Sequence, residues 1–281
     1  MDWLPLHIEG HLANTPEYVL ANVGSALSRD YIPFNDMLGT QSGAVAIVGS
    51  GPSLKKNWHE LKRFKGDILA CNAACQFLLE KGITPKYMFC FDADPLMLEF
   101  ITPHKEITYL IASRCPPQTF DLLKDCKVVC WHAAGDEGLE ELLLERGKKE
   151  PMVVGGGAAV TRSMVMVLPM GYTEVHLYGA DSSFADGDTH IRQSTTKERR
   201  IKVKVAHREF ETAPWMAKQF EDFKMLAALY RKQVGANFVV HGDGLIPHVA
   251  MVMGFKTDGI YKFRHFARRW NWKAQTLWEN L

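Results

Sequence analysis

Short apolar runs alternate with longer amphipathic stretches along the chain from residue 45 onward. The runs are rich in Val, Ile, Leu and Cys, and most of them end in a glycine or a polar residue. Buried parallel strands have this composition, whereas the stretches between them have the periodicity of helices. The predicted strands cover residues 45–48, 67–72, 87–91, 108–113, 127–131, 152–154, 174–178 and 237–241. The predicted helices cover residues 74–81, 139–146, 158–170 and 214–231.

This alternation predicts an α/β fold, with a Rossmann-like, mostly parallel sheet that carries helices on both faces. We expect residues 1–42 to form a helical lead-in, residues 43–250 the Rossmann-like domain and residues 251–281 a helical tail. Ligands bind to such sheets at the carboxyl ends of the strands. The residues that close the strands should therefore converge there, namely Ser50, Asn72, Asp92, Ser113, His132, Gly155 and Asp181.

The turn after the first of these strands, Gly49-Ser50-Gly51-Pro52-Ser53, is the most informative local motif. Its glycines permit close approach of the backbone, and Pro52 suits the first turn of a helix. Exposed N–H groups and the positive end of the helix dipole would then form an anion site, typically for a nucleotide phosphate. The alternative is a plain strand-to-helix turn, because the spacing matches neither G-x-G-x-x-G nor a P-loop.

The pattern breaks between residues 182 and 212, where a polar stretch carries Lys197, Arg199 and Arg200. A long loop inside a compact domain usually has a function. We interpret the segment as a basic lid, whose cations would contact phosphate groups when it closes and excludes water. A solvated charged hairpin is the alternative, because apolar and basic residues alternate over residues 201–205 and indicate an edge strand.

Two carboxylates, Asp92 and Asp94, follow the third predicted strand. Such a pair can hold Mg²⁺ or Mn²⁺ while the metal bridges a diphosphate. The alternative is that Asp94, which precedes Pro95, caps a helix without a metal.

Asp181 and His190 form a second candidate pair, at and beyond the end of the strand at residues 174–178. His190 suits a general base because the pKa of histidine lies near neutrality. Asn72 suits a ribose or base contact, since its amide both donates and accepts hydrogen bonds. The alternatives are an exposed loop histidine at position 190, a turn cap at Asp181 and a simple strand end at Asn72.

Composition narrows the class of protein. A hydrophobic content of 47% over 281 residues supplies a core, and a net charge of +1 argues against general nucleic-acid binding. The six cysteines fit buried, reduced thiols of a cytoplasmic protein. We expect no membrane-spanning helix, because no apolar run reaches ~20 residues, and no signal peptide, because the first residues lack a basic segment followed by an apolar one. The aromatic tail is expected to pack on its own domain, on a second copy of the chain or on a membrane surface.

Several motifs resemble one family, and they occur in its order. The run Val48–Leu54 resembles the G-x-G-P-S-L opening of the MptE-like domain, and Gly82-Ile83-Thr84-Pro85 with Asp92 resembles its G-I-x-P…D segment. Its glycine loop, its strand that ends in G-x-D and its G-x-T-H motif resemble Gly155-Gly156-Gly157, Leu177-Tyr178-Gly179-Ala180-Asp181 and Gly187-Asp188-Thr189-His190. The resemblance covers residues 45 to 246.

The resemblance implies a nucleotide-dependent transferase. The family includes archaeal 6-hydroxymethyl-dihydropterin diphosphokinases and a domain of flagellin glycosyltransferases, and it is similar in fold to bacterial sialyltransferases that use CMP-sialic acid. In those sialyltransferases a G-N-G-P-S-L loop and an R-C-N strand end contact the nucleotide. Here Ser50 stands in place of the asparagine, and Cys71-Asn72 matches the second element. Their histidine base before the helix has no counterpart in Glu211-Thr212-Ala213-Pro214-Trp215.

The expected function is transfer of a sugar from a CMP-, UDP- or GDP-linked donor to a small-molecule or glycan acceptor. Asp92 and Asp94 would hold a metal, and Asp181 and His190 would serve the acceptor. The nucleotide would contact Gly49, Ser50, Gly51, Pro52, Ser53, Asn72, Gly155, Gly156 and Gly157. The alternatives are an ATP- and Mg²⁺-dependent diphosphokinase of a pterin-like alcohol and a non-catalytic nucleotide-binding or interaction module. Self-association through the tail is a further expectation.

Overall fold

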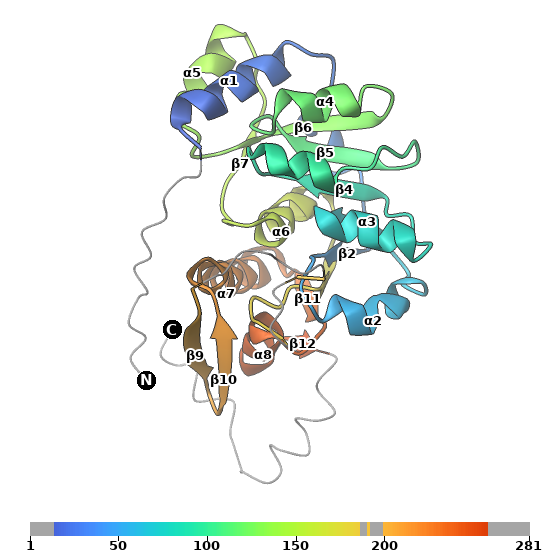
Figure 1. Cartoon of the computed structure of the whole chain (residues 1–281), viewed down its shortest axis with the longest axis vertical. Coiled ribbons are helices and arrows are strands. Elements are labelled where there is room, and N and C mark those ends of the chain that lie inside the picture. The colour runs from blue at the N-terminus through green and yellow to red at the C-terminus, as the bar shows by residue number, and fades with distance from the viewer. Residues whose placement is uncertain (1–13, 186–189, 192–198, 258–281) are drawn as a thin grey trace.

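The computed structural model describes residues 14–185, 190–191 and 199–257, and a ten-stranded sheet forms its centre (Figure 1). Every strand pair in this sheet is parallel. Parallel sheets are covered on both faces, which explains why the central parts of β2, β3, β4, β5 and β6 are apolar and buried. The strands are β1 (Ile32–Pro33), β2 (Ala44–Val48), β3 (Asp67–Cys71), β4 (Tyr87–Cys90), β5 (Thr108–Ala112), β6 (Lys127–Ala133), β7 (Met152–Val153), β8 (Glu174–Tyr178), β11 (Asn237–Val240) and β12 (Lys256–Thr257).

The order of the strands creates a topological switch point at the centre of the sheet. The strands lie side by side as β1-β6-β5-β4-β3-β2-β8-β11-β12, and β7 pairs with β6. From β2 the chain moves outward through β3, β4 and β5 to β6, and it then returns to the other side of β2 as β8. The loops that follow β2 and β8 therefore lead away in opposite directions. Open α/β sheets bind their ligands at this point.

Helices cover both faces of the sheet, as predicted, and the α/β Rossmann-like fold class is confirmed (Figure 1). The helices are α1 (Pro16–Leu27), α2 (Leu54–Leu61), α3 (Ala73–Glu80), α4 (Pro117–Leu122), α5 (Leu139–Glu145), α6 (Ala159–Met170), α7 (Pro214–Val234) and α8 (Leu245–Val252). The α2 and α3 helices lie on one face, and α6 lies on the other, where α7 packs against it. We find no helix in the described part of the chain with the length and apolarity that a membrane span requires.

The structure differs from the prediction mainly in short elements that contain proline. Four short elements and one 3-10 helix have no counterpart among the predicted elements: β1, α4, α8, β12 and η1 (Phe34–Met37). A second 3-10 helix, η2 (Pro95–Phe100), corresponds to the helix start that the sequence offered only as an alternative at Asp94. Several of these elements contain proline or begin with it. In a sequence, proline ordinarily indicates the end of a helix or strand, so such elements are not predicted. Because Lys256–Thr257 pairs with β11, the sheet domain continues past residue 250. Residues 258–281 lie outside the described residues, so the helical tail and its self-association stay predictions.

The segment between β8 and α7 contains an antiparallel hairpin that is separate from the main sheet, formed by β9 (Ile201–Val205) and β10 (Arg208–Thr212). Cross-strand ion pairs join Lys202 Nζ to Glu209 Oε1 over 2.9 Å and Arg200 Nη1 to Glu211 Oε2 over 3.0 Å. This arrangement is the charged hairpin that the sequence offered as the alternative to a lid. Residues 186–189 and 192–198, with Lys197 among them, lie outside the described residues, and lid closure stays a prediction.

Candidate functional site

A cavity of about 840 Å³ lies at the switch point, where the loops after β2 and β8 meet the N-termini of α6 and α7. Its lining contains eight of the sixteen site residues proposed from the sequence: Gly49, Ser50, Gly51, Asn72, Asp92, Gly157, Asp181 and His190. The remaining proposed residues of the described chain lie outside the lining: Pro52, Ser53, Asp94, Gly155, Gly156, Arg199 and Arg200. The fold therefore gathers segments that are far apart in the sequence at the carboxyl ends of the strands.

Hydrogen bonds close the glycine loop after β2 against the loop after β8. The Gly49 N–H donates to Tyr178 O at the end of β8, and the Gly51 N–H donates to Gly179 O in the loop that follows, each over 2.8 Å. The Ser53 N–H donates to Asp181 Oδ2 over 2.8 Å. These N–H groups, which the sequence analysis assigned to a phosphate, are thus engaged within the protein. The loop forms a wall of the cavity, and its phosphate contact stays a prediction.

Asp181 lies beneath this loop and is 3% exposed. An added Cβ on Gly51 would lie 2.4 Å from Asp181 Oδ2, and one on Gly244 would lie 2.6 Å from Asp181 Cα, so both approaches require glycine. Burial raises the pKa of Asp181 to about 6, because the charged form loses hydration there. Its second oxygen, Oδ1, is buried without a hydrogen-bond partner in the described structure. A buried carboxyl group with a shifted pKa beside a cavity is a candidate for function.

Two residues of the cavity lining have backbone conformations that side chains rarely adopt. Asn72 has φ 48° and ψ −127°, and Ser182 has φ 48°. Such strain costs about 1–3 kcal/mol for each residue, and it persists at functional sites where the surrounding structure enforces it. Here the Asn72 N–H donates to a carbonyl of β4 over 3.2 Å, and the Ser182 hydroxyl donates to Gln219 Oε1 over 3.0 Å. The strain therefore lies on two sides of the same site.

The N-terminus of α6 opens on the cavity, and the first turn of this helix lines it from Gly157 to Thr161. Gly156, with φ 77°, brings the chain so close to this turn that an added Cβ would lie 2.6 Å from Arg162 N. The positive end of a helix dipole and its free N–H groups attract anions. The corresponding end of α2 already receives the Asp181 carboxylate. The N–H groups just before α6 also have partners, because the Gly157 N–H donates to Asp222 Oδ2 over 2.7 Å and the Ala158 N–H donates to Thr161 Oγ1 over 3.2 Å. An anionic ligand at this end of α6 would therefore contact the N–H groups of residues 159–161, and that contact stays a prediction.

His190 and Trp215 form a stacked aromatic pair in the cavity wall, with ring centroids 5.9 Å apart and an angle of 13° between the rings. The Ile191 N–H donates to Ser50 O over 2.7 Å, which attaches the histidine segment to the glycine loop. Trp215 is 40% exposed, so its ring is accessible to a ligand. Trp215 is not among the residues predicted from the sequence, because a tryptophan in a helical pattern is ordinarily a core residue.

The Asp92–Asp94 pair is divided between two roles. Asp92 lines the cavity, and its Oδ1 accepts the Asp94 N–H over 3.1 Å. Asp94 Oδ1 accepts the Leu96 N–H over 2.9 Å and so caps η2. This is the helix-capping geometry that the sequence offered as the alternative to a metal site.

A fixed positive charge, also missed from the sequence, lines the cavity near Phe91. Arg114 Nη1 pairs with Asp136 Oδ1 over 2.9 Å, and its guanidinium carbon lies 5.1 Å from the centroid of the Phe91 ring. Arg162 lies 4.8 Å from the same ring. Burial raises the pKa of Asp136 and lowers that of Arg162. The signal in the sequence was the polar pair at the end of the fourth predicted strand, of which only Ser113 was predicted to reach the ligand.

Ser113 and His132 do not line the cavity, so the expectation that they converge on a ligand is wrong. Both are fully buried. His132 Nδ1 lies 2.9 Å from Ser113 Oγ, and its Nε2 lies 3.1 Å from Glu150 Oε2. Burial lowers the pKa of His132. These groups form a polar network in the core, which satisfies their hydrogen bonds away from water.

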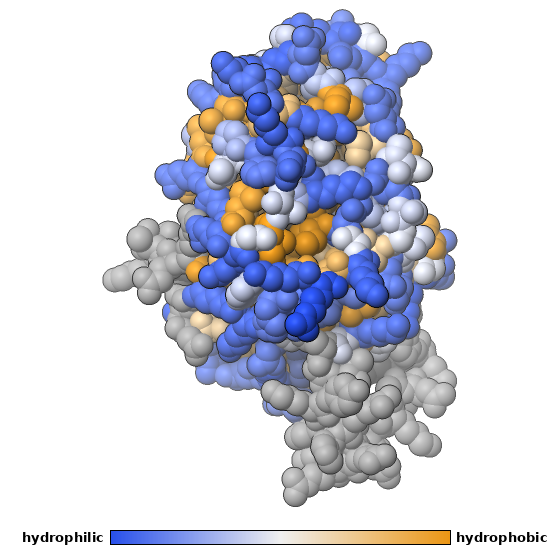
Figure 2. Space-filling view, turned by 90° about the vertical axis from the view of Figure 1, so that its right-hand side faces the viewer, coloured by the Kyte–Doolittle hydropathy of each residue, from blue (hydrophilic) through white to orange (hydrophobic). Residues whose placement is uncertain are grey.

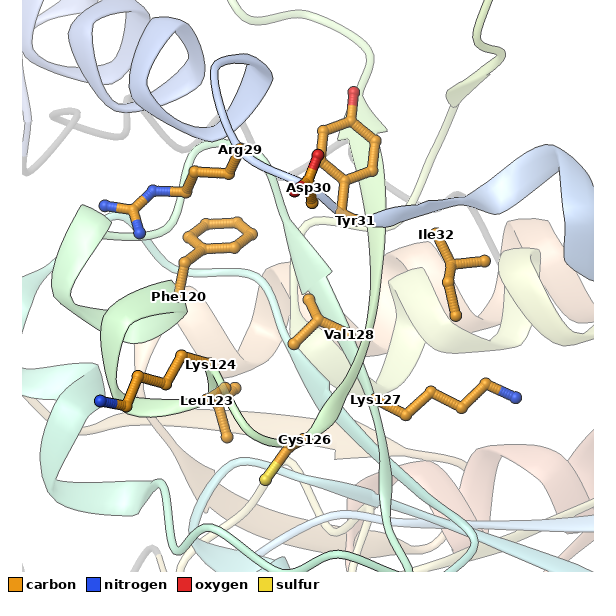
Figure 3. Close-up of a pocket in the computed structure, with 10 residues that line it drawn as sticks. All are labelled: Arg29, Asp30, Tyr31, Ile32, Phe120, Leu123, Lys124, Cys126, Lys127 and Val128. Atoms are coloured by element: carbon orange, nitrogen blue, oxygen red, sulfur yellow. The ribbon is translucent and has the colours of Figure 1, made fainter.

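A second cavity, of about 430 Å³, lies between the chain before β1 and the start of β6 (Figure 3). Phe120 and Val128 line it, and the side chains of Lys124 and Lys127 extend from it in different directions. Because Lys127 begins β6, this cavity lies at the amino end of that strand. None of the residues proposed from the sequence lines it.

Replacing Asn72 with glycine is expected to stabilise the protein by about 1 kcal/mol, because glycine adopts this backbone conformation without strain. The same change is expected to weaken nucleotide binding at least tenfold, since the amide is lost from the cavity. Urea denaturation and calorimetric titration measure the two effects. Ala206→Gly is the matched control, because Ala206 also has a positive φ, 51°, but lies in the β9–β10 turn. Stabilisation without weaker binding would show that Asn72 has no part in recognition.

Comparisons with known proteins agree with this architecture. A family model described as "6-hydroxymethylpterin diphosphokinase MptE-like" matches residues 18–187. The MAf glycosyltransferase from Magnetospirillum magneticum AMB-1 is 18% identical with a TM-score of 0.59, over 82% of this chain and 37% of that one. This chain therefore spans little more than a third of that protein, and the likeness shows the fold alone.

Two sialyltransferases are more distantly similar. A mammalian sialyltransferase solved with Gal-beta-1-3GalNAc-ortho-nitrophenol is 13% identical with a TM-score of 0.40, over 78% of this chain and 77% of that one. A monofunctional alpha-2,3-sialyltransferase from Campylobacter jejuni is 15% identical with a TM-score of 0.34, over 70% and 74% of the two chains. A comparison with curated protein sequences gives no match.

Proposed function

Because this chain belongs to the MptE-like family, we propose that it is a nucleotide-dependent transferase and that it transfers a sugar from a nucleotide-linked donor. The observation that carries the proposal is the cavity of about 840 Å³ at the switch point, bordered by a helix N-terminus and by the strained residue Asn72. Ligand pockets in proteins have volumes of this order, and α/β sheets place them at this position.

In this proposal the donor phosphate lies at the N-terminus of α6. The helix dipole and the N–H groups of its first turn attract the negative charge. Arg114, which Asp136 holds in place, adds a fixed positive charge to the same cavity. Asn72 contacts the ribose or the base, because its Oδ1 has no hydrogen-bond partner in the described structure and can accept one from the ligand.

The acceptor lies against the ring of Trp215, with its hydroxyl group beside His190. The hydroxyl oxygen attacks the anomeric carbon of the donor sugar while His190 takes up the hydroxyl proton. The bond between that carbon and the phosphate oxygen breaks, and the nucleotide leaves with the electron pair. Asp181 is a positioning residue in this scheme, because its carboxylate holds the glycine loop through the Ser53 N–H.

A divalent metal fits the residues of this site only in part. Asp92 offers a carboxylate to the cavity, but Asp94 is engaged as the cap of η2. Within the described ranges, no group of three or more His, Cys, Asp or Glu residues is arranged to hold a metal ion. The proposed transfer step therefore uses no metal, and the nucleotide panel below tests whether binding requires one.

A diphosphokinase is the second candidate, because the description of the family model names 6-hydroxymethylpterin diphosphokinase. The accessible ring of Trp215 suits a flat pterin as well as a sugar. The two candidates differ in the donor, which is ATP with release of AMP in one and a nucleotide sugar in the other. A non-catalytic nucleotide-binding module is the third outcome.

A nucleotide panel separates these functions. We expect the nucleotide of the true sugar donor, among CMP, UDP and GDP, to raise the melting temperature by about 5 °C at 100 times its Kd. The shift should persist in EDTA and in Asp94→Asn, and the matching nucleotide sugar should release that nucleotide on incubation. A shift with ATP alone that needs Mg²⁺ and is lost in Asp92→Asn would favour the diphosphokinase. No shift with any nucleotide would refute both transferases, and a shift without turnover would favour the binding module.

A further inference from the structure

The outer face of α2 concentrates positive charge that the proposed transfer reaction does not use. The chain as a whole has a formal charge of +1. Yet five exposed basic residues lie on α2 and just beyond it: Lys55, Lys56, Lys62, Arg63 and Lys65. In Figure 1, α2 and α3 lie on the right-hand side, and Figure 2 turns that side toward the viewer as a largely hydrophilic face with smaller apolar areas.

Two partly exposed aromatic rings lie among these cations. Lys62 Nζ lies 5.2 Å from the centroid of the Trp58 ring. Lys81, at the end of α3, lies with its Nζ 5.4 Å from the Trp58 ring and 5.3 Å from the Phe77 ring. The α2 and α3 helices thus form one continuous surface in which lysine stems cover aromatic rings, which we call the α2–α3 face.

The two carboxylates on and just beyond α2, Glu60 and Asp67, are directed toward other groups. Glu60 Oε2 accepts the Tyr178 hydroxyl over 3.4 Å and lies 3.5 Å from His241 Nδ1. Asp67, just after Lys65, pairs with Lys86 over 2.6 Å. Within the described residues, Lys56, Arg63 and Lys65 have no ion pair. The face is therefore open to an anionic partner.

We propose that the α2–α3 face binds the protein to an anionic lipid surface. Tryptophan is favoured at the boundary between lipid and water, and lysine stems can extend from that depth so that their ammonium groups reach the headgroups. Clusters of four to eight basic residues on a helix surface are typical of binding to anionic lipids. Binding to single-stranded nucleic acid would use open aromatic faces for base stacking, but two ammonium groups already lie over Trp58.

Flotation with lipid vesicles tests this proposal. One set of vesicles is phosphatidylcholine alone, and the other contains 30% phosphatidylglycerol. We expect the full chain to float with the anionic vesicles at about 0.1 M salt and to dissociate at 0.5 M, because salt screens exposed charges. The double variant Lys62→Glu/Lys65→Glu is expected to bind at least tenfold more weakly.

The control is Lys124→Glu/Lys127→Glu, which makes the same charge change beside the second cavity, in the turn after α4 and at the start of β6 (Figure 3). It should float like the unmodified chain. Equal losses in the two double variants, equal binding to neutral vesicles, or binding to poly(U) RNA without binding to vesicles would each overturn the proposal. A cooperative melting transition of each variant without ligand shows that it is folded, so this test does not depend on the outcome of the transferase experiment.

Discussion

Replacing Gly51 with alanine is expected to destabilise the protein by about 3 kcal/mol or more and to abolish nucleotide binding. The added Cβ would lie 2.4 Å from Asp181 Oδ2 and 2.6 Å from Gly179 O. The first contact displaces a buried carboxylate, and the second pushes the loop after β2 away from the loop after β8. Both movements change the wall of the cavity. Urea denaturation measures the stability, and calorimetric titration with the nucleotide found in the panel measures the binding.

The matched control is Gly24→Ala. Gly24 lies inside α1, and no heavy atom lies within 4 Å of the position that its Cβ would take. Alanine in a helix is more favourable than glycine, so this variant should be about 0.5–1 kcal/mol more stable than the unmodified chain, with unchanged nucleotide binding. If the two alanine variants have similar stabilities, the close packing between the two loops is not a feature of the protein in solution.

Replacing Asp181 with asparagine is expected to stabilise the protein at pH 7.5 and to leave turnover largely unchanged. The carboxyl group has a pKa of about 6 in the folded protein against an ordinary value of 3.8. A raised pKa means that the folded state holds its proton more tightly than the unfolded state does. The stability that this proton contributes is fully present below pH 4 and is lost as the pH rises through 6. The loss amounts to about 3 kcal/mol. Asparagine avoids this loss of stability because its side chain is neutral at every pH, and its carbonyl can still accept the Ser53 N–H.

The stabilisation should therefore be largest above pH 7 and should vanish near pH 4. Urea denaturation at both pH values measures the stabilisation. Release of nucleotide from the sugar donor measures turnover, which should change less than about threefold because asparagine keeps the bond to the Ser53 N–H. Asp125→Asn, at an exposed carboxylate, is the control for the change in net charge, and we expect it to alter neither quantity. A stabilisation of equal size at both pH values would show that the Asp181 carboxyl group is not the source.

The sequence predicted the central sheet well, for a definite physical reason. A parallel strand buried on both faces must be apolar at every position, as in β4, where every residue is buried. Because the carboxyl ends of such strands meet at one edge, the convergence of Ser50, Asn72, Asp92 and Asp181 followed from the order of the elements. The prediction was wrong for Ser113 and His132. Both are buried in a polar network in which His132 contacts Ser113 and Glu150.

The site depends on contacts that no local pattern contains. The sequence placed an anion at the start of α2, but a carboxylate 128 positions further along the chain occupies that helix end. Trp215 was missed because its accessibility depends on the position of its helix beside the cavity. The strain at Asn72 was also missed, since asparagine at a strand end usually indicates an ordinary turn.

The position of β2 between β3 and β8 has a consequence for the newly synthesised chain. One edge of β2 can pair with β3 almost at once, but its other edge pairs with β8, and the loops that follow the two strands are joined by residues 128 positions apart. At translation rates of about 5–20 residues per second, β2 exposes an unpaired apolar edge on the ribosome for roughly ten seconds. Such edges are templates for aggregation. The central strand of the molecule is therefore the part that most needs protection by a chaperone until β8 has emerged.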